Sequence, residues 1–365
     1  MSAAEADQPA DPSVLVRVHD GIGRLTLNRP RSINALSHEM VHLMQSALDA
    51  WAGDPSVRVV VIDGAGDRGL CAGGDIVAIY ADARAGGSAS VAYWADEYRL
   101  DATIAGYPTP VVILMDGIVM GGGVGISAHA SHRIVDDDAT IAMPEVGIGF
   151  VPDVGGLFLL ARAPGKLGLH AALTGARLSA ADAIHVGLAD VVVPRARREE
   201  LLAGLAAGDV DAAIARVAVP TPPSALTAER DWIDVAYDRE TIEDVLVALE
   251  SYREEAPTKA RTVLTRSSPT ALKVALRSFQ EAAGDQDLGQ TLARDLRVAA
   301  RCLAGHDFLE GIRAQVIDKD RTPHWAPATL AEVSAADVDA YFAPLGEREL
   351  DLSSDRPHTP TGARP

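Results

Sequence analysis

Two carboxylates in the segment MPEVGIGFVPDVGG, residues 143–156, have the type and spacing that best suit chemistry in this sequence. Glu145 and Asp153 lie eight positions apart among glycines and apolar side chains. Burying a charged carboxylate without a partner costs free energy or raises its pKa, so such a pair does not help the chain to fold. Either both acids face water or they take part in a reaction, and the segment alone leaves both alternatives open.

Two glycine-rich segments offer backbone N–H groups for the same chemistry. GLCAGGDI (69–76) and MDGIVMGGGVGIS (115–127) each follow an apolar run and place glycines where a helix is expected to begin. The first N–H groups of a helix have no partners, and two of them converging on one point would form an oxyanion hole. Two tight turns are the alternative. A phosphate-binding loop is disfavoured, because residues 121–125 do not fit G-x-G-x-x-G.

Apolar patterns predict a sheet that would position these segments. Residues 14–27 alternate apolar and polar around Asp20, which indicates a hairpin. Continuous apolar runs follow at 57–64, 110–119 and 189–194, separated by helical patterns. Such runs are typical of strands buried on both faces, so we expect the α/β class, with helices covering a sheet.

Helical patterns occur between the runs and dominate the last third of the chain. Ser37 is expected to cap an amphipathic helix that ends near Trp51. Residues 241–264 and 268–283 predict further helices, the second with Ser268 as its cap. The expected organisation is a disordered N-terminus at 1–12, a core at 13–220, a helical region at 221–347 and a disordered tail at 348–365.

The composition limits the partners and the compartment. The 365 residues include 51 acidic and 33 basic side chains and no basic run, so nucleic acid is not expected as a partner. The longest purely apolar runs are only a few residues, which excludes a transmembrane helix and gives no reason to expect a membrane partner. Cys71 and Cys302 give no disulfide framework, and the start lacks a targeting pattern. These features favour a cytoplasmic protein.

The sequence resembles the crotonase (enoyl-CoA hydratase/isomerase) superfamily in motifs that follow one another in the same order and spacing. They are LNRPRSINALS (27–37), CAGGDI (71–76), GGGVGIS (121–127), MPEVGIGFVPDVGG (143–156) and GHDFLEGIRAQVIDKDRTPHW (305–325). The resemblance covers most of residues 14–345 and is closest to the 3-hydroxyisobutyryl-CoA hydrolase branch. It implies a spiral of β-β-α turns with a helical C-terminal region, and an acyl-CoA thioester as substrate.

The resemblance assigns a role to each of the residues singled out above. Gly74 and Gly122 match the family's two oxyanion-hole positions, and Glu145 matches its catalytic glutamate. Asp153 stands where hydratases usually carry glycine, and Gly125 stands where hydratases carry a second glutamate. We hypothesise that Glu145 attacks the thioester carbonyl, forming a mixed anhydride, or activates a water that does so. Asp153 would then position that water or the substrate hydroxyl.

Three more residues are substrate-binding candidates by the same resemblance. Glu97 matches a glutamate that contacts the acyl group in the hydrolase branch, although a charge on a helix alone more often indicates a solvated face. Arg31 stands where the family often has a CoA-contacting lysine, and Lys319 resembles a family lysine near CoA. Each would supply a positive charge to the phosphates, and each alone more often indicates a surface charge.

Two motifs suggest different chemistry and are disfavoured. HEMVH (38–42) fits the zinc-protease pattern H-E-x-x-H, but the sequence shows no third ligand, so no metal site is expected. Cys71 lies in an oxyanion loop, but free cysteines commonly pack as small buried residues and no paired histidine is evident.

The sequence therefore predicts an acyl-CoA thioester hydrolase. By family inference it acts on 3-hydroxyisobutyryl-CoA, an intermediate of valine breakdown, and needs no cofactor beyond the CoA of its substrate. A hydratase or isomerase of the same fold is the near alternative, and Gly125 argues against it. A non-catalytic acyl-CoA-binding protein and a zinc hydrolase are more distant alternatives. The sequence leaves the oligomeric state open, a homo-oligomer included.

Overall fold

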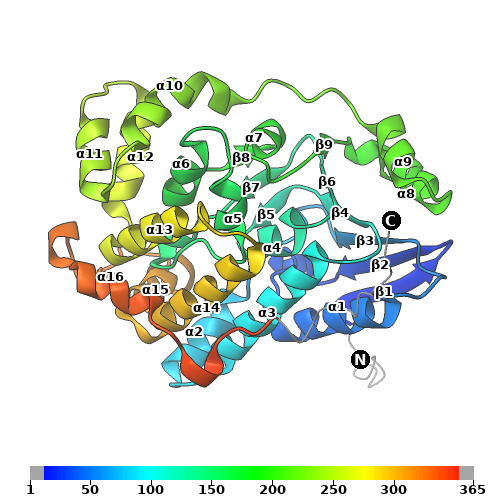
Figure 1. Ribbon diagram of the computed structural model, residues 1–365, viewed down its shortest axis with the longest axis horizontal. Coiled ribbons are helices and arrows are strands. Elements are labelled where there is room, and N and C mark those ends of the chain that lie inside the picture. The colour runs from blue at the N-terminus through cyan, green and yellow to red at the C-terminus, as the bar shows by residue number, and fades with distance from the viewer. Residues whose placement is uncertain (1–11, 353–365) are drawn as a thin grey trace, which may run out of the picture.

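The computed structural model describes residues 12–352 and confirms the α/β class (Figure 1). Predicted disorder at 1–11 and 353–365 lies outside the described residues. The strands are β1 (Val14–His19), β2 (Ile22–Leu27), β3 (Val59–Gly64), β4 (Val111–Met115), β5 (Ile118–Met120), β6 (His132–Val135), β7 (Thr140–Ala142), β8 (Leu178–Ser179) and β9 (Val191–Val192).

Helices separate these strands, and residues 221–352 form helices and loops with no strand. The first nine are α1 (His38–Trp51), α2 (Ile76–Arg84), α3 (Ala89–Ala105), α4 (Gly122–Ala128), α5 (Gly156–Leu160), α6 (Leu167–Thr174), α7 (Ala180–His185), α8 (Arg198–Ala206) and α9 (Val210–Val217). The others are α10 (Ala225–Tyr237), α11 (Ile242–Glu250), α12 (Glu255–Arg266), α13 (Pro269–Ala282), α14 (Leu288–Ala304), α15 (His306–Ile312) and α16 (Ala335–Phe342). Short 3₁₀ turns include η1 (Pro30–Ser32) and η2 (Glu145–Ile148), and a π-helical turn, η4 (Arg313–Ile317), follows α15.

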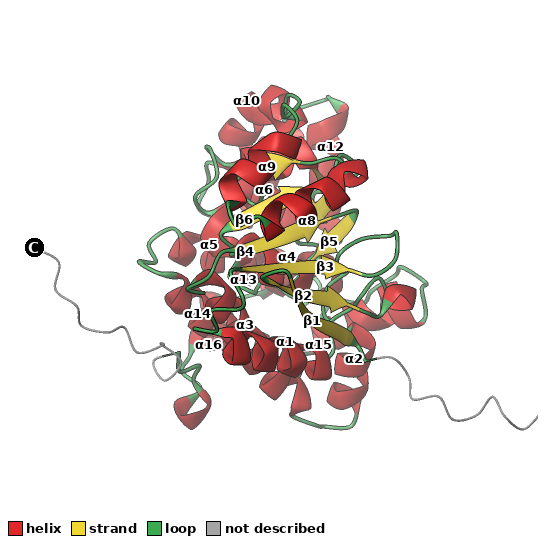
Figure 2. Cartoon of the chain, turned by 90° about the vertical axis from the view of Figure 1, so that its right-hand side faces the viewer, coloured by secondary structure: helices red, strands yellow, loops and turns green. Residues whose placement is uncertain are grey.

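The main sheet has six strands in the order β1-β2-β3-β4-β6-β9. Its first pair is the predicted antiparallel hairpin, with Asp20 and Gly21 both at positive φ, as a type I′ turn requires. The other pairs are parallel. Helices α8 and α9 cover one face of the sheet (Figure 2), where they pack on Val59 and Val61, while Val60 and Ile62 face the main core. The continuous apolar run of β3 is explained because both of its faces are buried.

The run at 110–119 forms two strands, where the sequence indicated one. Gly117 has φ of +49°, and this left-handed residue ends the ladder after β4. The chain then starts β5, which belongs to a second, three-stranded sheet of order β5-β7-β8. This change of sheet directs the following glycines, 121–123, toward the helical layer and away from the main sheet. No strand was predicted at β6, which pairs with β4 inside the main sheet.

Two helices of the N-terminal half connect the sheet to the site. Helix α1 begins as predicted, with the Ser37 hydroxyl accepting the N–H of Met40, and it packs against α3. Helix α3 is 17 residues long and buries three aromatic and two acidic side chains in the same stretch, Tyr93, Trp94, Glu97, Tyr98 and Asp101. Acids buried on a helix need an explanation other than folding.

The C-terminal helices pack on the rest of the same chain. Helix α14 lies against α3, α15 lies against α2, and one hydrophobic core includes residues from Val14 to Leu350. The helix predicted over 241–264 is two helices, α11 and α12, separated by residues 251–254. Residues 348–352 differ from the expected disordered tail, because Leu350 is buried and Glu349 forms an ion pair with Arg297 at 2.9 Å.

No helix within residues 12–352 has both the length and the apolar character needed to cross a membrane.

Candidate active site

One cavity of about 180 Å³ brings together most of the residues predicted to carry chemistry. Glu145, Asp153, Gly74, Gly122 and Glu97 all line it. Its remaining wall is mainly apolar and includes Ile76, Ile79, Trp94, Ile148, Phe150 and Phe308. The other two candidates, Arg31 and Lys319, are exposed and do not line the cavity.

The two predicted oxyanion glycines lie next to each other although 48 positions separate them in the sequence. A Cβ built on Gly122 would lie 3.4 Å from the backbone nitrogen of Gly74. Gly122 is the first residue of α4, so its N–H has no acceptor within the helix. Within residues 12–352, neither the Gly74 nor the Gly122 N–H donates a hydrogen bond to another residue. Two free donors side by side suit an oxyanion.

Carboxylates explain why this loop carries glycines. A Cβ on Gly121 would lie 2.9 Å from Oε1 of Glu145, and a Cβ on Gly122 would lie 2.4 Å from Oε1 of Glu97. Gly121 also has φ of +49°, which favours glycine. The glycines therefore leave room for one carboxylate on each side of the two N–H donors.

Glu145 lines the cavity, and one of its carboxylate oxygens is buried without a partner in the described part of the chain. It begins η2, is 7% exposed, and its Oε2 atom has no hydrogen-bond partner among the described residues. Burial, reinforced by the negative charge of Asp153 and then of Glu97, raises the pKa of Glu145 well above its usual value. A desolvated carboxylate of this kind is reactive once it is ionised.

Asp153 is held by a hydroxyl and by an unusual turn. The Tyr98 hydroxyl donates to its Oδ2 atom at 2.6 Å. The two residues that follow, Val154 and Gly155, both have positive φ, and the Gly155 N–H donates to Asp295 on α14 at 2.9 Å. Burial raises the pKa of Asp153 to about 7, and the Tyr98 hydrogen bond partly offsets this effect. Asp153 therefore titrates far above the range of an ordinary aspartate and together with its acidic neighbours.

Glu97 lies in the site and not on a solvated helix face. Its side chain is 2% exposed, and it accepts a hydrogen bond of 2.9 Å from the Tyr93 hydroxyl. Burial, and then the charge of Asp153, raise the pKa of Glu97 to about 8. Three carboxyls with raised pKa in one cavity can hold and exchange protons near neutral pH.

Sequence reasoning missed four further polar residues that lie close to these acids, all buried. Tyr93 lines the cavity as well, whereas Tyr98, Asp101 and Asp295 do not. The spacing of four in Tyr93, Glu97 and Asp101 places them on one face of α3, and that periodicity was a signal in the sequence. No local signal identified Asp295, because α14 reaches the site only through tertiary packing.

Asp101 fills the space beside the position where hydratases carry their second glutamate. A Cβ on Gly125 would lie 2.7 Å from Cβ of Val154 and 2.8 Å from Oδ2 of Asp101. Neither Asp101 oxygen has a hydrogen-bond partner among the described residues. Burial, and then the charge of Glu97, raise the pKa of Asp101 well above its usual value. The packing therefore leaves no room for a side chain at 125.

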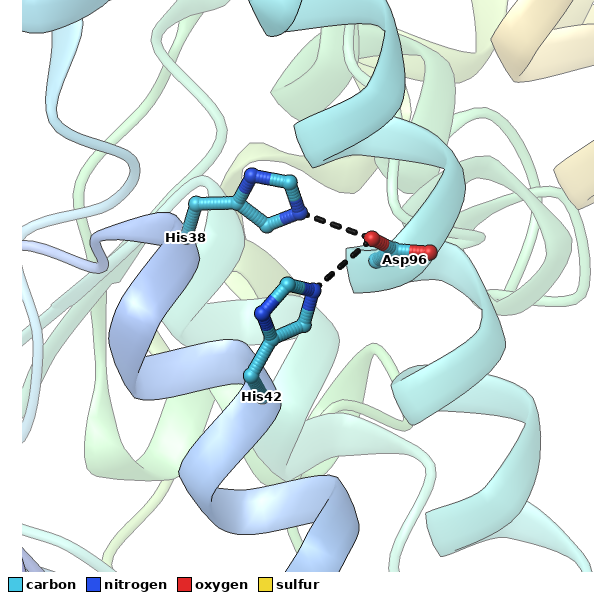
Figure 3. Close-up of side chains that lie close together, drawn as sticks. All are labelled: His38, His42 and Asp96. Carbon is cyan, nitrogen blue, oxygen red and sulfur yellow. Dashed lines mark hydrogen bonds and ion pairs between the residues drawn. The ribbon is translucent and has the colours of Figure 1, made fainter.

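The two motifs disfavoured above have different outcomes. Cys71 is fully buried, and burial raises the pKa of its thiol to about 12, so it packs as a small apolar residue and is no nucleophile. The histidines of HEMVH do have a third potential ligand, which the sequence did not reveal. Asp96 on α3 contacts both His38 and His42 (Figure 3).

Several known proteins are similar to this chain over most of its length. The profile of the enoyl-CoA hydratase/isomerase family matches residues 22–342. A Gallus gallus protein named 3-hydroxyisobutyryl-CoA hydrolase, mitochondrial, is 37% identical, covering 95% of this chain and 92% of its own. A Danio rerio protein of the same name is 39% identical, covering 90% and 89%. A solved structure named carnitinyl-CoA dehydratase, from Mycobacterium thermoresistibile, is 52% identical with a TM-score of 0.90, covering 93% of this chain and 99% of that one.

Proposed function

The chain belongs to the enoyl-CoA hydratase/isomerase family, and from that premise we propose that it hydrolyses acyl-CoA thioesters, with 3-hydroxyisobutyryl-CoA as substrate. The observation that carries the proposal is that Glu145, whose Oε2 is buried without a hydrogen-bond partner among the described residues, lines the same cavity as Gly74 and Gly122. The two vertebrate relatives named as 3-hydroxyisobutyryl-CoA hydrolases support the choice of substrate.

The proposed reaction begins with the thioester carbonyl between the carboxylates. Its oxygen accepts hydrogen bonds from the N–H groups of Gly74 and Gly122 while an oxygen of Glu145 attacks the carbonyl carbon. The C–S bond then breaks, the sulfur leaves as CoA and takes a proton from the carboxyl cluster, and a mixed anhydride remains. Water hydrolyses the anhydride, which releases the acid and regenerates Glu145. Loss of one oxyanion donor typically costs about 2.7–4 kcal/mol of barrier.

The alternative role for Glu145 is that of a general base. Its carboxylate would then remove a proton from a water that attacks the carbonyl directly, and no covalent intermediate would form. Hydroxylamine added during turnover distinguishes the two, because it traps an anhydride as a hydroxamate on Glu145, detectable by peptide mass. The absence of this adduct during rapid turnover would favour the general base.

Replacing Glu145 by glutamine tests both versions. Gln keeps the size of the side chain but cannot attack or accept a proton, so we expect kcat to fall by at least about 10²–10⁴-fold. Substrate binding should persist, because the glycine N–H groups and the apolar wall are unchanged. Thiol release close to that of the wild type in a folded variant would contradict both roles.

Hydration by the same fold is the second candidate, because the similar solved structure is named as a dehydratase. The packing at Gly125 favours hydrolysis: Asp101 and Val154 occupy the space that a second glutamate would need. Addition of water across a double bond benefits from two carboxylates that divide the proton transfers. This chain instead offers Glu145 with Asp153 and Glu97.

The deciding experiment measures both activities on one preparation. Free thiol released from 3-hydroxyisobutyryl-CoA is followed beside hydration of crotonyl-CoA. Thiol release without hydration is the expected result. Hydration without thiol release would replace the proposal by a hydratase, and binding of both compounds without any product would indicate a non-catalytic acyl-CoA-binding protein.

Substrate contacts and conditions complete the proposal. Glu97 would accept a hydrogen bond from the acyl hydroxyl, and Asp153 would position water. Arg31 and Lys319 would contact the phosphates of CoA outside the cavity.

The reaction uses carboxyls and backbone donors and so needs no added cofactor. Full activity after treatment with a chelator would support this expectation.

A cytoplasmic location is the part of the proposal that the relatives favour least, since those from animals are named mitochondrial. The acidic composition and the two unpaired cysteines support it. Cell fractionation with an antibody to the protein tests it directly, and enrichment in an organelle would contradict it.

A further inference from the structure

Two histidines and a carboxylate meet outside the cavity, at the contact between α1 and α3 (Figure 3). His38 and His42 lie one turn apart on α1, and their Nε2 atoms lie 2.7 and 3.0 Å from the same oxygen, Oδ2, of Asp96. All three potential ligand atoms lie within 4.8 Å of one another. We propose that these side chains bind a divalent cation of the zinc type, which joins α1 to α3.

The spacing is close to what zinc requires. Tetrahedral zinc with Zn–N bonds of about 2.0–2.1 Å and Zn–O bonds of about 2.0–2.2 Å places its ligand atoms about 3.3–3.4 Å apart. The Nε2 atoms of His38 and His42, now 2.7 and 3.0 Å from the Asp96 oxygen, would therefore move away from it by about 0.6 Å and about 0.3 Å. The two nitrogens, which lie within 4.8 Å of each other, would also need to lie about 3.3–3.4 Å apart. Rotation of these partly exposed side chains provides that movement without a change in the helices.

The surroundings suit a ligand set of two imidazoles and one carboxylate. Arg99 Nη1 lies 2.8 Å from the other carboxylate oxygen, Oδ1 of Asp96, and so fixes the carboxylate without blocking Oδ2. Partners of this kind orient metal ligands. The side chain of His42 is 59% exposed, so a cation and a water as fourth ligand have access from solvent.

The same geometry indicates a binding site and not a hydrolytic centre. In H-E-x-x-H enzymes the glutamate acts as general base beside the metal. Here Glu39 Oε2 instead accepts a hydrogen bond of 2.8 Å from the Ser13 hydroxyl. The third ligand comes from a neighbouring helix, so a bound cation would act as a cross-link that stabilises the contact of α1 with α3.

The test uses the full chain, freed of metal by a chelator and titrated with Co(II) and Zn(II). We expect one Co(II) per chain with the visible absorption of a tetrahedral site, displaced by Zn(II), and a melting temperature that rises with zinc concentration. Loss of a residue that only orients a metal ligand typically lowers metal affinity about 10–100-fold. His42 is proposed as a ligand itself, so His42→Ala should weaken zinc binding by at least about 100-fold.

Two further variants make the test specific. Asp96→Asn keeps the size and an oxygen acceptor but removes the anionic ligand, and should also weaken binding strongly. His19→Ala removes an exposed histidine that contacts one carboxylate, Asp20 at 3.1 Å, and should leave zinc binding unchanged. The proposal would be overturned if the wild type showed no tetrahedral cobalt absorption. It would also be overturned if the wild type and His42→Ala bound zinc with equal affinity. In either case the three side chains would form only two hydrogen bonds to Asp96. Circular dichroism verifies that each variant is folded.

Discussion

The carboxyls of Glu145, Asp153 and Glu97 cannot all be ionised at neutral pH in one buried cavity. Burial comes first in raising each pKa, and the charge of Asp153 raises the pKa of the other two further. Asp153, with a pKa of about 7, ionises first as pH rises, and Glu97, at about 8, follows. The cavity thus holds a carboxylate able to react together with a proton able to reach the leaving thiolate.

We therefore expect kcat/KM to rise with pH, with a limb well above the usual carboxyl range, since deprotonation of Glu145 creates the reactive carboxylate. Removing the charge in Asp153→Asn should lower the pKa of Glu145, so the rising limb of the remaining activity should move to lower pH. The profile of kcat/KM against pH measures this. Asp295→Asn is the matched control, because Asp295 is another buried carboxyl that does not contribute to the raised pKa of Glu145. If the rising limb of the profile moved equally in both variants, the charge of Asp153 would not be the cause of the raised pKa of Glu145.

Asp101 leads to a prediction on stability. Its raised pKa keeps it protonated in the folded protein at pH values where the unfolded chain has ionised it, so the folded state binds more protons. The free energy of unfolding should then fall as pH rises above the usual carboxyl pKa of about 4, by up to about 1.4 kcal/mol per pH unit for each such group. Asp101→Asn removes one group and should make this fall shallower.

Urea unfolding at about pH 5 and about pH 8 tests this, with the slope of the free energy against pH as the measured quantity. Asp67→Asn, at an exposed position, is the control and should follow the wild type. Equal slopes for the wild type and Asp101→Asn would mean that Asp101 is not protonated in the fold.

At the residue scale, the sequence predicted the groups that belong to recognisable motifs. Glu145, Asp153, Gly74 and Gly122 were predicted together and lie around one cavity. Tyr98 and Asp295 were not predicted, because their relation to Asp153 depends on how α3 and α14 pack. Asp96 was missed for the same reason: its partners His38 and His42 precede it by more than 50 positions.

At the scale of elements, α4 decides what reaction the cavity permits. Its position 125 packs against the turn at Val154 and against Asp101 of α3, with no space for a Cβ. We expect Gly125→Glu to lower the melting temperature and to gain no hydration of crotonyl-CoA, because overpacking typically costs about 1–3 kcal/mol. Gly125→Ala is the matched control for the steric effect alone, and it should be destabilised less. A stable Gly125→Glu variant that hydrates crotonyl-CoA would show that α4 can accept the second glutamate.

Element boundaries were predictable where a specific side chain fixes them. Ser37 and Ser268 cap α1 and α13, as their hydroxyls were expected to do. The break between α11 and α12 was missed although Pro257 signalled it: a proline is tolerated in the first turn of a helix that starts at Glu255 but would disrupt a continuous helix. The break between β4 and β5 depends on residues 118–120, after Gly117, pairing with β7 in a second sheet, and that pairing is not local.

At the scale of the whole molecule, segments far apart in the sequence, from Ala72 to Phe308, line the cavity. Residues 33–36 lie beside the loop of Gly74, with the Leu36 N–H donating to the Gly73 carbonyl at 2.8 Å. Phe308 of α15 closes the cavity from the C-terminal region, and the chain continues through η4 to Lys319. The two cations proposed for CoA therefore stand on segments that border the cavity, although neither lines it.

The charge of the molecule makes these cations testable. The formal net charge is −18, so the phosphates of CoA need local positive charge. Arg31 and Lys319 are exposed and form no ion pair with another described residue, and the acids beside Lys319, Asp318 and Asp320, both bind Arg313. An exposed ionic contact contributes about 0.2–1 kcal/mol, which corresponds to roughly 1.4–5-fold in affinity. Arg31→Gln and Lys319→Gln should each raise KM by that factor and leave kcat unchanged.

The control for this prediction lies in the substrate as well as in the protein. A thioester of pantetheine carries the same acyl group without the nucleotide phosphates, so its KM should be the same in the wild type and both variants. Lys259→Gln, at an exposed position on α12, should leave the KM of the CoA thioester and the KM of the pantetheine thioester unchanged. Because screening weakens exposed charge contacts, added salt should raise the KM of the CoA thioester more in the wild type than in the variants. If both substrates responded alike to the substitutions, the two cations would act through the fold and not through the phosphates.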